Sequence, residues 1–108
     1  MWEDIIHNFG LYLRLEKSLS ENSIEAYLHD IKKLEEFLII HEQITPPQQV
    51  ETQTIRDFLY WLNMIGIAER SQARIVSGLK AFYAYLWIEK LIETDPTELI
   101  DSPKIGKK

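Results

Sequence analysis

The sequence predicts one packed domain with an all-α fold, and three observations support this prediction. Apolar residues recur every three to four positions through four long stretches of the chain, which is the period of an amphipathic helix. No segment shows the strict alternation of apolar and polar residues that marks a half-buried strand. The chain has 108 residues, of which 45% are hydrophobic, and this is enough for one packed domain.

Two helices are expected in the first half of the chain, over about residues 2–15 and 20–41. Gly10 costs the first helix about 1 kcal/mol relative to alanine, so packing must hold that helix. Ser20 is suited to cap the second helix, and Leu19 before it can pack against Ile24 as a hydrophobic staple. The helical pattern breaks at TPPQQ (residues 45–49), because the residue before each proline is forced out of the α region.

Two more helices are expected in the second half. Thr52 is the predicted cap of a third helix, which should stop near Gly66. A fourth helix follows after a very short turn and includes residues 71–86. Its predicted core face consists of Ile75, Val76, Leu79, Phe82, Tyr83 and Leu86.

Another face of the fourth helix combines cations, hydroxyls and residues with almost no side chain. Its members are Arg70, Ser71, Arg74, Ser77, Gly78 and Ala81. Such a surface suits a helix pressed against a polyanion, because arginine and serine bind phosphate oxygens and small residues allow close approach of the backbone. No acidic residue lies between Arg70 and Ile88. This local charge asymmetry indicates DNA.

A short fifth helix is predicted over residues 97–100. Asp95 is a capping residue, Pro96 stands at the first helical position and Glu98 places a carboxylate at the third. This pattern is typical of a helix start.

The overall charge argues against a strong DNA binder. The net charge is −5, whereas affinity for DNA depends largely on lysines and arginines that displace phosphate counterions. The acids are concentrated in residues 21–42 and 89–101, away from Arg70, Arg74 and Lys80. We therefore expect weak or incomplete binding of DNA.

The composition also restricts the compartment. The chain has no cysteine, which excludes disulfides and thiolate metal sites and fits a reducing cytosol. Its N-terminus lacks the basic region of a signal peptide, and no apolar run reaches the length of a membrane span. We expect a cytoplasmic protein without membrane association.

Four parts of the sequence resemble the N-terminal core-binding domain of the tyrosine recombinases, the family of phage integrases and Xer-like proteins. They are LRLEKSLSENSIEAYLHDI at 13–31, TIRDFL at 54–59, the segment 70–86, and Asp95-Pro96 with SPKIG at 102–106. Their order and spacing cover nearly the whole chain. The resemblance implies a SAM-like four-helix core-binding domain of two crossed helical hairpins over residues 1–101, with the short C-terminal helix in addition. It also implies that residues 102–108 begin a linker to a C-terminal catalytic domain.

The resemblance implies a function in DNA integration or recombination. Such a domain clamps the double-stranded DNA of a recombination site together with other recombinase protomers of the full-length protein. In that family the nucleophilic tyrosine and its arginine, lysine and histidine partners belong to the catalytic domain. This chain is therefore expected to have no catalytic residue, no enzymatic activity by itself, and a monomeric state. Ala68 departs from the family pattern, since relatives often place a hydroxyl cap there.

Arg74 is the first candidate for a DNA contact, because it lies in the middle of the small polar face. The alternative is a solvated arginine paired with Glu69 or another surface acid. Four further candidates on this helix are Arg70, Ser71, Ser77 and Lys80, of which Lys80 lies off the central stripe.

A second candidate surface is the start of the second helix. Ser20, Asn22 and Ser23 could bind a phosphate there, since a helix N-terminus favours anions. The alternative is plain capping without any ligand. Positive charge at this end would come from Arg14 and Lys17.

Two single residues complete the candidate DNA contacts. Tyr27 matches a family position and could pack at the core edge with its hydroxyl toward a phosphate. Lys104, in the linker, is the last candidate.

No cofactor and no metal are expected, because His7, His29 and His41 show no ligand-like spacing. The main rival to DNA binding is a non-catalytic helical module for protein interaction, in which Tyr85, Trp87 and the acidic surfaces meet a protein partner. A small helical enzyme is disfavoured, since no catalytic constellation is visible.

Overall fold

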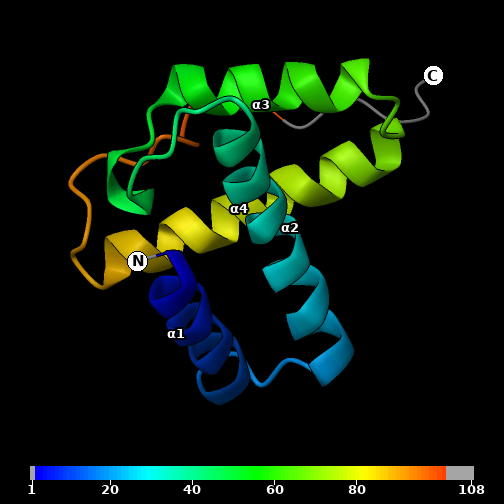
Figure 1. Cartoon of the computed structure of the whole chain (residues 1–108). Coiled ribbons are helices and arrows are strands. Elements are labelled where there is room, and N and C mark those ends of the chain that lie inside the picture. The colour runs from blue at the N-terminus through cyan, green and yellow to red at the C-terminus, as the bar shows by residue number, and fades with distance from the viewer. Residues whose placement is uncertain (1, 102–108) are drawn as a thin grey trace. The chain divides into compact units, whose positions relative to one another are not determined.

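The computed structural model describes residues 2–101, and all regular structure within them is helical (Figure 1). The elements are α1 (Trp2–Leu15), α2 (Glu21–Ile40), the short 3-10 helix η1 (Pro47–Gln49), α3 (Thr52–Met64) and α4 (Glu69–Ile88). The predicted all-α fold with four long helices is thus confirmed. The chain forms two compact units that divide between Pro47 and Gln48, and each contains one pair of helices.

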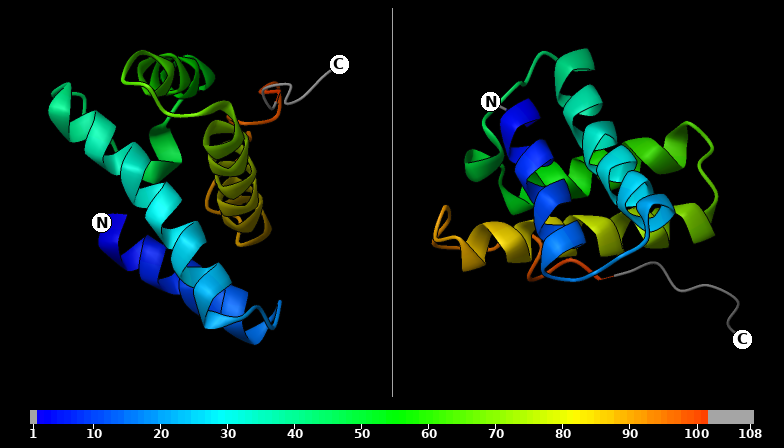
Figure 2. Two further views of the ribbon diagram at one scale, coloured as in Figure 1. Left: turned by 90° about the vertical axis from the view of Figure 1, so that its right-hand side faces the viewer. Right: turned by 90° about the horizontal axis from the view of Figure 1, so that it is seen from below.

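The first unit is a hairpin in which α2 returns beside α1 (Figures 1 and 2). A Cβ atom placed on Gly10 would lie 3.3 Å from Cδ1 of Leu28, so the glycine allows α1 to approach α2 closely. Phe9 and Tyr27 pack edge to face with ring centroids 6.3 Å apart. The Trp2 indole donates a hydrogen bond of 2.7 Å to the Thr45 carbonyl and so holds the end of the unit to its beginning. This packing offsets the low helix propensity of Gly10.

The second unit is formed by α3 and α4, which are joined by a short turn (Figure 1). All six residues predicted for the core face of α4 are buried, as are three residues of α3: Ile55, Phe58 and Leu62. Phe82 and Tyr83 meet edge to face at 5.1 Å. Burial raises the pKa of the Tyr83 hydroxyl above its ordinary value, and the nearby Asp95 carboxylate adds to this shift.

Three helices end in the same way, with one residue in the left-handed region. These residues are Glu42 (φ 54°), Gly66 (φ 90°) and Lys90 (φ 62°), which follow α2, α3 and α4. After each of them a backbone N–H reaches five residues back, for example from Ile67 to the Leu62 carbonyl at 3.0 Å. This is the Schellman arrangement, and Gly66 ends α3 as the sequence predicts.

The predicted cap of α3 is wrong. Glu51 is the N-cap, without a side-chain capping bond, and Thr52 is the first helical residue. The Thr52 hydroxyl instead donates a hydrogen bond of 2.9 Å to the carbonyl of Pro96. Thr52 therefore ties the start of α3 to the C-terminal segment.

The predicted fifth helix is also wrong. Residues 96–99 form hydrogen-bonded turns, with short backbone bonds from Glu98 to Asp95 and from Ile100 to Thr97. The Asp95 carboxylate accepts bonds from both the backbone N–H and the hydroxyl of Thr97, at 2.8 and 2.7 Å. This local motif takes the place of continued helical hydrogen bonding.

Candidate nucleic-acid interface

The start of α4 is positioned by a buried glutamine. The N-cap residue Ala68 offers no side-chain capping bond. Gln72 lies one turn further on and donates hydrogen bonds to the Ile67 carbonyl at 2.7 Å and to Oδ1 of Asn63 at 3.4 Å. The glutamine thereby fixes the α3–α4 turn and orients the first two turns of α4. No sequence pattern marked this residue.

The N-terminal half of α4 presents most of the predicted polar face to solvent. Arg70, Arg74 and Ser77 are exposed, and Ser71 is half-buried. Gly78, by contrast, is buried. The expected close approach of a duplex to the backbone at Gly78 therefore does not fit this structure, whereas the side chains of the two arginines are open to solvent.

Lys80 has a partner within its own unit. Its ammonium group donates a hydrogen bond of 2.7 Å to the Thr97 carbonyl, and its side chain is half-buried. The same Thr97 is held by Asp95 and is itself buried. This bond favours a structural role for Lys80, as an anchor of the C-terminal turn, over the predicted DNA contact.

Replacing Lys80 by methionine should separate these two roles. We expect a loss of about 1 kcal/mol in the free energy of unfolding, since one hydrogen bond from a charged donor is removed at a partly solvated site. The slope of log affinity for duplex DNA against log salt should stay unchanged. A fall of about 1 in that slope would instead identify Lys80 as a phosphate contact. The matched control is Lys90→Met, which removes the charge of an exposed lysine and should leave the free energy of unfolding nearly unchanged.

The start of α2 is capped by its own serine. The Ser20 hydroxyl accepts the backbone N–H of Ser23 at 3.2 Å and lies 3.1 Å from the Ser23 hydroxyl. The predicted capping role of Ser20 is thus confirmed. Asn22 and Ser23 are exposed, so both can still meet a ligand from solvent.

Arg14 is engaged by a carboxylate across the α1–α2 turn. Its guanidinium binds Glu21 through two bonds of 2.8 Å, one from Nε to Oε2 and one from Nη2 to Oε1. The hydrogen bonds with Arg14 hold the pKa of the Glu21 carboxyl below its usual range, and they raise the pKa of Arg14. The positive charge that the sequence predicts here is therefore largely balanced, apart from exposed Lys17.

The substitution Arg14→Gln should raise the pKa of Glu21 toward the ordinary glutamate value of about 4.3. The pair contributes stability above that ordinary pKa and loses it as the pH falls through the lowered folded pKa, because a depressed acid favours the folded state only while ionised. The free energy of unfolding of the Arg14→Gln variant should therefore lack the part that the pair contributes and that is lost as the pH falls. An NMR titration of the Glu21 carboxyl measures the shift, and Lys32→Gln, eleven residues along α2, should leave it unchanged.

The last two candidate contacts are Tyr27, which lies within the described residues, and Lys104, which does not. Tyr27 is half-buried and packs on Phe9, which agrees with a position at the core edge. Lys104 and the rest of the predicted linker lie outside the described residues.

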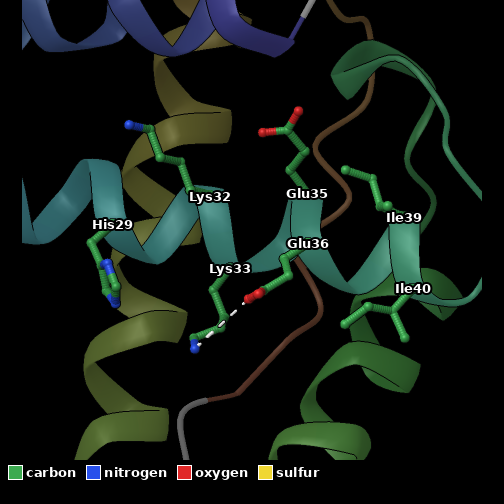
Figure 3. A pocket seen from close by; sticks show the side chains of 7 residues that line it. All are labelled: His29, Lys32, Lys33, Glu35, Glu36, Ile39 and Ile40. Carbon is green, nitrogen blue, oxygen red and sulfur yellow. Dashed lines mark ion pairs between the residues drawn. The ribbon is translucent and has the colours of Figure 1, made fainter.

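The outer surface of α2 mixes charges of both signs. Figure 3 shows a pocket of about 370 Å³ on this helix, lined by His29, Lys32, Lys33, Glu35, Glu36, Ile39 and Ile40. Lys33 and Glu36 form an ion pair at 3.9 Å, and Glu35 projects on the opposite side of the helix, as Lys32 does (Figure 3). The two lysines are balanced by two glutamates, so this surface lacks the net positive charge that a duplex requires.

Two further findings concern the described residues as a set. Within residues 2–101, no group of three or more histidine or acidic side chains is placed to hold a metal ion. No helix between residues 2 and 101 combines the length and the hydropathy of a membrane-spanning segment.

Comparison with known proteins places the chain in a family. Residues 6–90 match the profile of a family described as phage integrase, N-terminal SAM-like domain. The chain is 36% identical over 106 residues to tyrosine recombinase XerD of Staphylococcus aureus strain Mu50, which covers 98% of this chain and 36% of that protein. No solved structure is significantly similar to the chain.

A relative from another organism agrees with this match. TTE1313 of Caldanaerobacter subterraneus subsp. tengcongensis, a protein assigned to the tyrosine recombinases, is 36% identical over 109 residues, which cover 100% of this chain and 37% of that protein. The chain thus spans about a third of the length of the relatives it matches. From the matched profile, the identity over nearly its whole length and the four-helix fold, the chain belongs to the family of SAM-like N-terminal domains of tyrosine recombinases and phage integrases.

Proposed function

We propose that this chain is the DNA-binding, core-binding domain of a site-specific tyrosine recombinase or integrase. In this proposal it clamps the duplex of a recombination site during integration or recombination, next to other protomers of the full-length protein. The names of the relatives support a role in recombination. A protein whose substrate is duplex DNA would act where that DNA lies, which we take to be the cytoplasm.

One observation carries the proposal for the DNA surface. The N-terminal half of α4 exposes Arg70 and Arg74 on a stretch that has no acidic residue as far as Ile88. Ser71 and Ser77 add hydroxyl groups that can bind phosphate oxygens. In a chain with a net charge of −5, this stretch presents cations to a polyanion without an acidic residue of its own.

The start of α2 is a second proposed contact, through Asn22, Ser23 and Lys17. The backbone N–H groups of a helix N-terminus favour a phosphate, and exposed Lys17 supplies positive charge there, whereas Arg14 is bound to Glu21. The Ser20 hydroxyl accepts the backbone N–H of Ser23, so Ser20 would support this contact by fixing the start of α2 rather than by binding a phosphate itself.

A salt titration of duplex binding tests the proposal. Binding should be weak, with little dependence on sequence, and should fall steeply as salt rises, because phosphate contacts release counterions and carry no sequence information. An affinity that does not respond to salt would contradict a phosphate-binding surface.

The proposal also assigns the chemistry of strand cleavage to a domain other than this one. A suicide duplex that traps covalent intermediates should give no protein–DNA adduct with this chain on denaturing electrophoresis. An adduct on any of its tyrosines would show that the domain is catalytic.

A further inference from the structure

The C-terminal end of α4 carries a second apolar face, distinct from the core face. Ala84, Trp87 and Ile88 follow one another on α4 at the helical spacing i, i+3 and i+4, and Leu91 lies in the segment that follows the helix. Trp87 is 60% exposed, Ile88 55% and Leu91 44%, whereas the neighbouring Tyr85 is only 7% exposed. Trp87 and Ile88 are therefore large apolar side chains left open to solvent at one end of α4, and exposed apolar side chains that gather on a folded domain mark a surface for interaction.

A groove adjoins this face. It has a volume of about 420 Å³ and is lined by Ala84, Trp87, Glu93, Thr94, Asp95 and Glu98. Its apolar wall comes from α4, and its polar wall comes from the segment that follows the helix. The turn bonds between Asp95 and Thr97 hold this polar wall in place. The groove therefore has one apolar side and one acidic side.

The negative charge around the groove favours a positively charged occupant. Residues 89–101 contain five acidic residues and one lysine, so a phosphate backbone would be repelled here. The Asp95 carboxylate is already used within the turn, whereas Glu93 and Glu98 are exposed. A cation can therefore pair with these two glutamates and can also lie against the indole face of Trp87.

We propose that this surface, formed by Trp87, Ile88, Leu91, Glu93 and Glu98, binds an amphipathic segment of a second protein that carries lysine or arginine beside apolar side chains. The apolar side chains of that segment cover Trp87 and its neighbours, and its cations pair with the two glutamates. Trp87 is thirteen residues from Arg74, which is about 20 Å along a helix. The two surfaces lie at opposite ends of α4, so this inference does not depend on the proposed binding of DNA.

A designed peptide can serve as the probe. A fluorescein-labelled helix of leucine and lysine, with the leucines at i, i+3, i+4 and i+7, should bind the chain, and a matched helix of leucine and glutamine should bind more weakly. Trp87→Ala should weaken binding of the lysine peptide roughly tenfold or more, since buried tryptophans dominate such interfaces. The double variant with Glu93→Gln and Glu98→Gln should weaken binding and remove most of its salt dependence.

The matched control is Tyr60→Ala, which removes another exposed aromatic side chain, from α3. It should leave the affinity for the peptide unchanged. Equal affinity of the Trp87→Ala variant and the unaltered chain, or equal effects of Trp87→Ala and Tyr60→Ala, would overturn the proposal. Trp87 is exposed, so the helicity of the Trp87→Ala variant should stay unchanged by circular dichroism.

Two further measurements separate the alternatives. Sedimentation equilibrium of the chain alone should show no self-association; a dimer that is lost in Trp87→Ala would make a second copy the occupant and overturn the assignment to another protein. Duplex binding should be the same with and without Trp87→Ala. A loss of DNA binding in that variant would place the duplex on this surface and so contradict the inference.

Discussion

Replacing Arg74 by glutamate is expected to abolish measurable binding of duplex DNA. Arg74 is exposed within the acid-free stretch of α4, so the substitution removes a cation and places an anion on the proposed phosphate-binding surface. Binding by phosphate contacts alone has a Kd of about 10⁻⁴ to 10⁻⁶ M at physiological salt. A loss of only about 1.4 kcal/mol, which is tenfold, then suffices to carry the complex beyond detection. Fluorescence anisotropy of a labelled duplex at low salt measures the effect.

Two controls make this result specific. Arg56→Glu reverses an exposed arginine of α3 and changes the net charge equally, so it should weaken binding much less if Arg74 is a contact. Arg74→Gln should have an intermediate effect and reduce the salt slope by about 1. Circular dichroism should show unchanged helicity for all three variants. Normal affinity in a folded Arg74→Glu protein would exclude this surface.

The substitution Phe82→Ala is expected to have the largest effect on stability. Phe82 is 0% exposed and packs edge to face on Tyr83, so its loss removes apolar burial and leaves a cavity in the second unit. Such changes cost about 3–5 kcal/mol. A domain of this size has a total stability of about 5–15 kcal/mol, so the variant should lose a large part of it. Urea unfolding followed by circular dichroism gives the change in free energy.

Trp87→Ala is the matched control for that experiment, because it removes a larger aromatic side chain from the same helix at an exposed position. Its effect should stay within about 0.5 kcal/mol. A comparable loss of stability in both variants would mean that Trp87 is packed as firmly as Phe82, and that the exposed apolar face of α4 is misassigned.

The sequence predicts the helices well where their determinants are local. The apolar period places α1 over Trp2–Leu15 and buries the intended face of α4. The cap at Ser20 and the end of α3 near Gly66 follow from residues within a few positions of each helix end. These features depend only on neighbours that a window of sequence contains.

The errors arise where a side chain finds a partner far along the chain. Thr52 is a good capping residue, yet its hydroxyl binds the Pro96 carbonyl, which lies 44 residues away. The predicted fifth helix fails partly for a similar reason, because the Thr97 carbonyl accepts a hydrogen bond from Lys80, which lies 17 residues away. No periodic pattern contains such pairings.

In the candidate site, too, the features that depend on local sequence are predictable and those that depend on tertiary packing are not. The exposure of Arg70 and Arg74 is a property of helical periodicity and is therefore predictable. The pairing of Arg14 with Glu21 depends on the path of the α1–α2 turn, and the orienting bonds of Gln72 depend on the α3–α4 turn. Both turns are set by packing, so the sequence reveals which cations exist but not which are already engaged.

Two charges at the ends of α4 oppose the dipole of that helix. Arg70 lies in the first turn, where the partial charge of the helix is positive, and Glu89 is the C-cap, where it is negative, whereas the neighbouring Glu69 and Lys90 have the favourable sign. Each unfavourable placement costs about 0.3–1 kcal/mol. The free domain is therefore less stable than its helix could be, and an anion bound near Arg70 would recover part of that stability. Thermal unfolding should accordingly shift upward when duplex DNA is present, and the sequence that is best for binding is not the one that is best for folding.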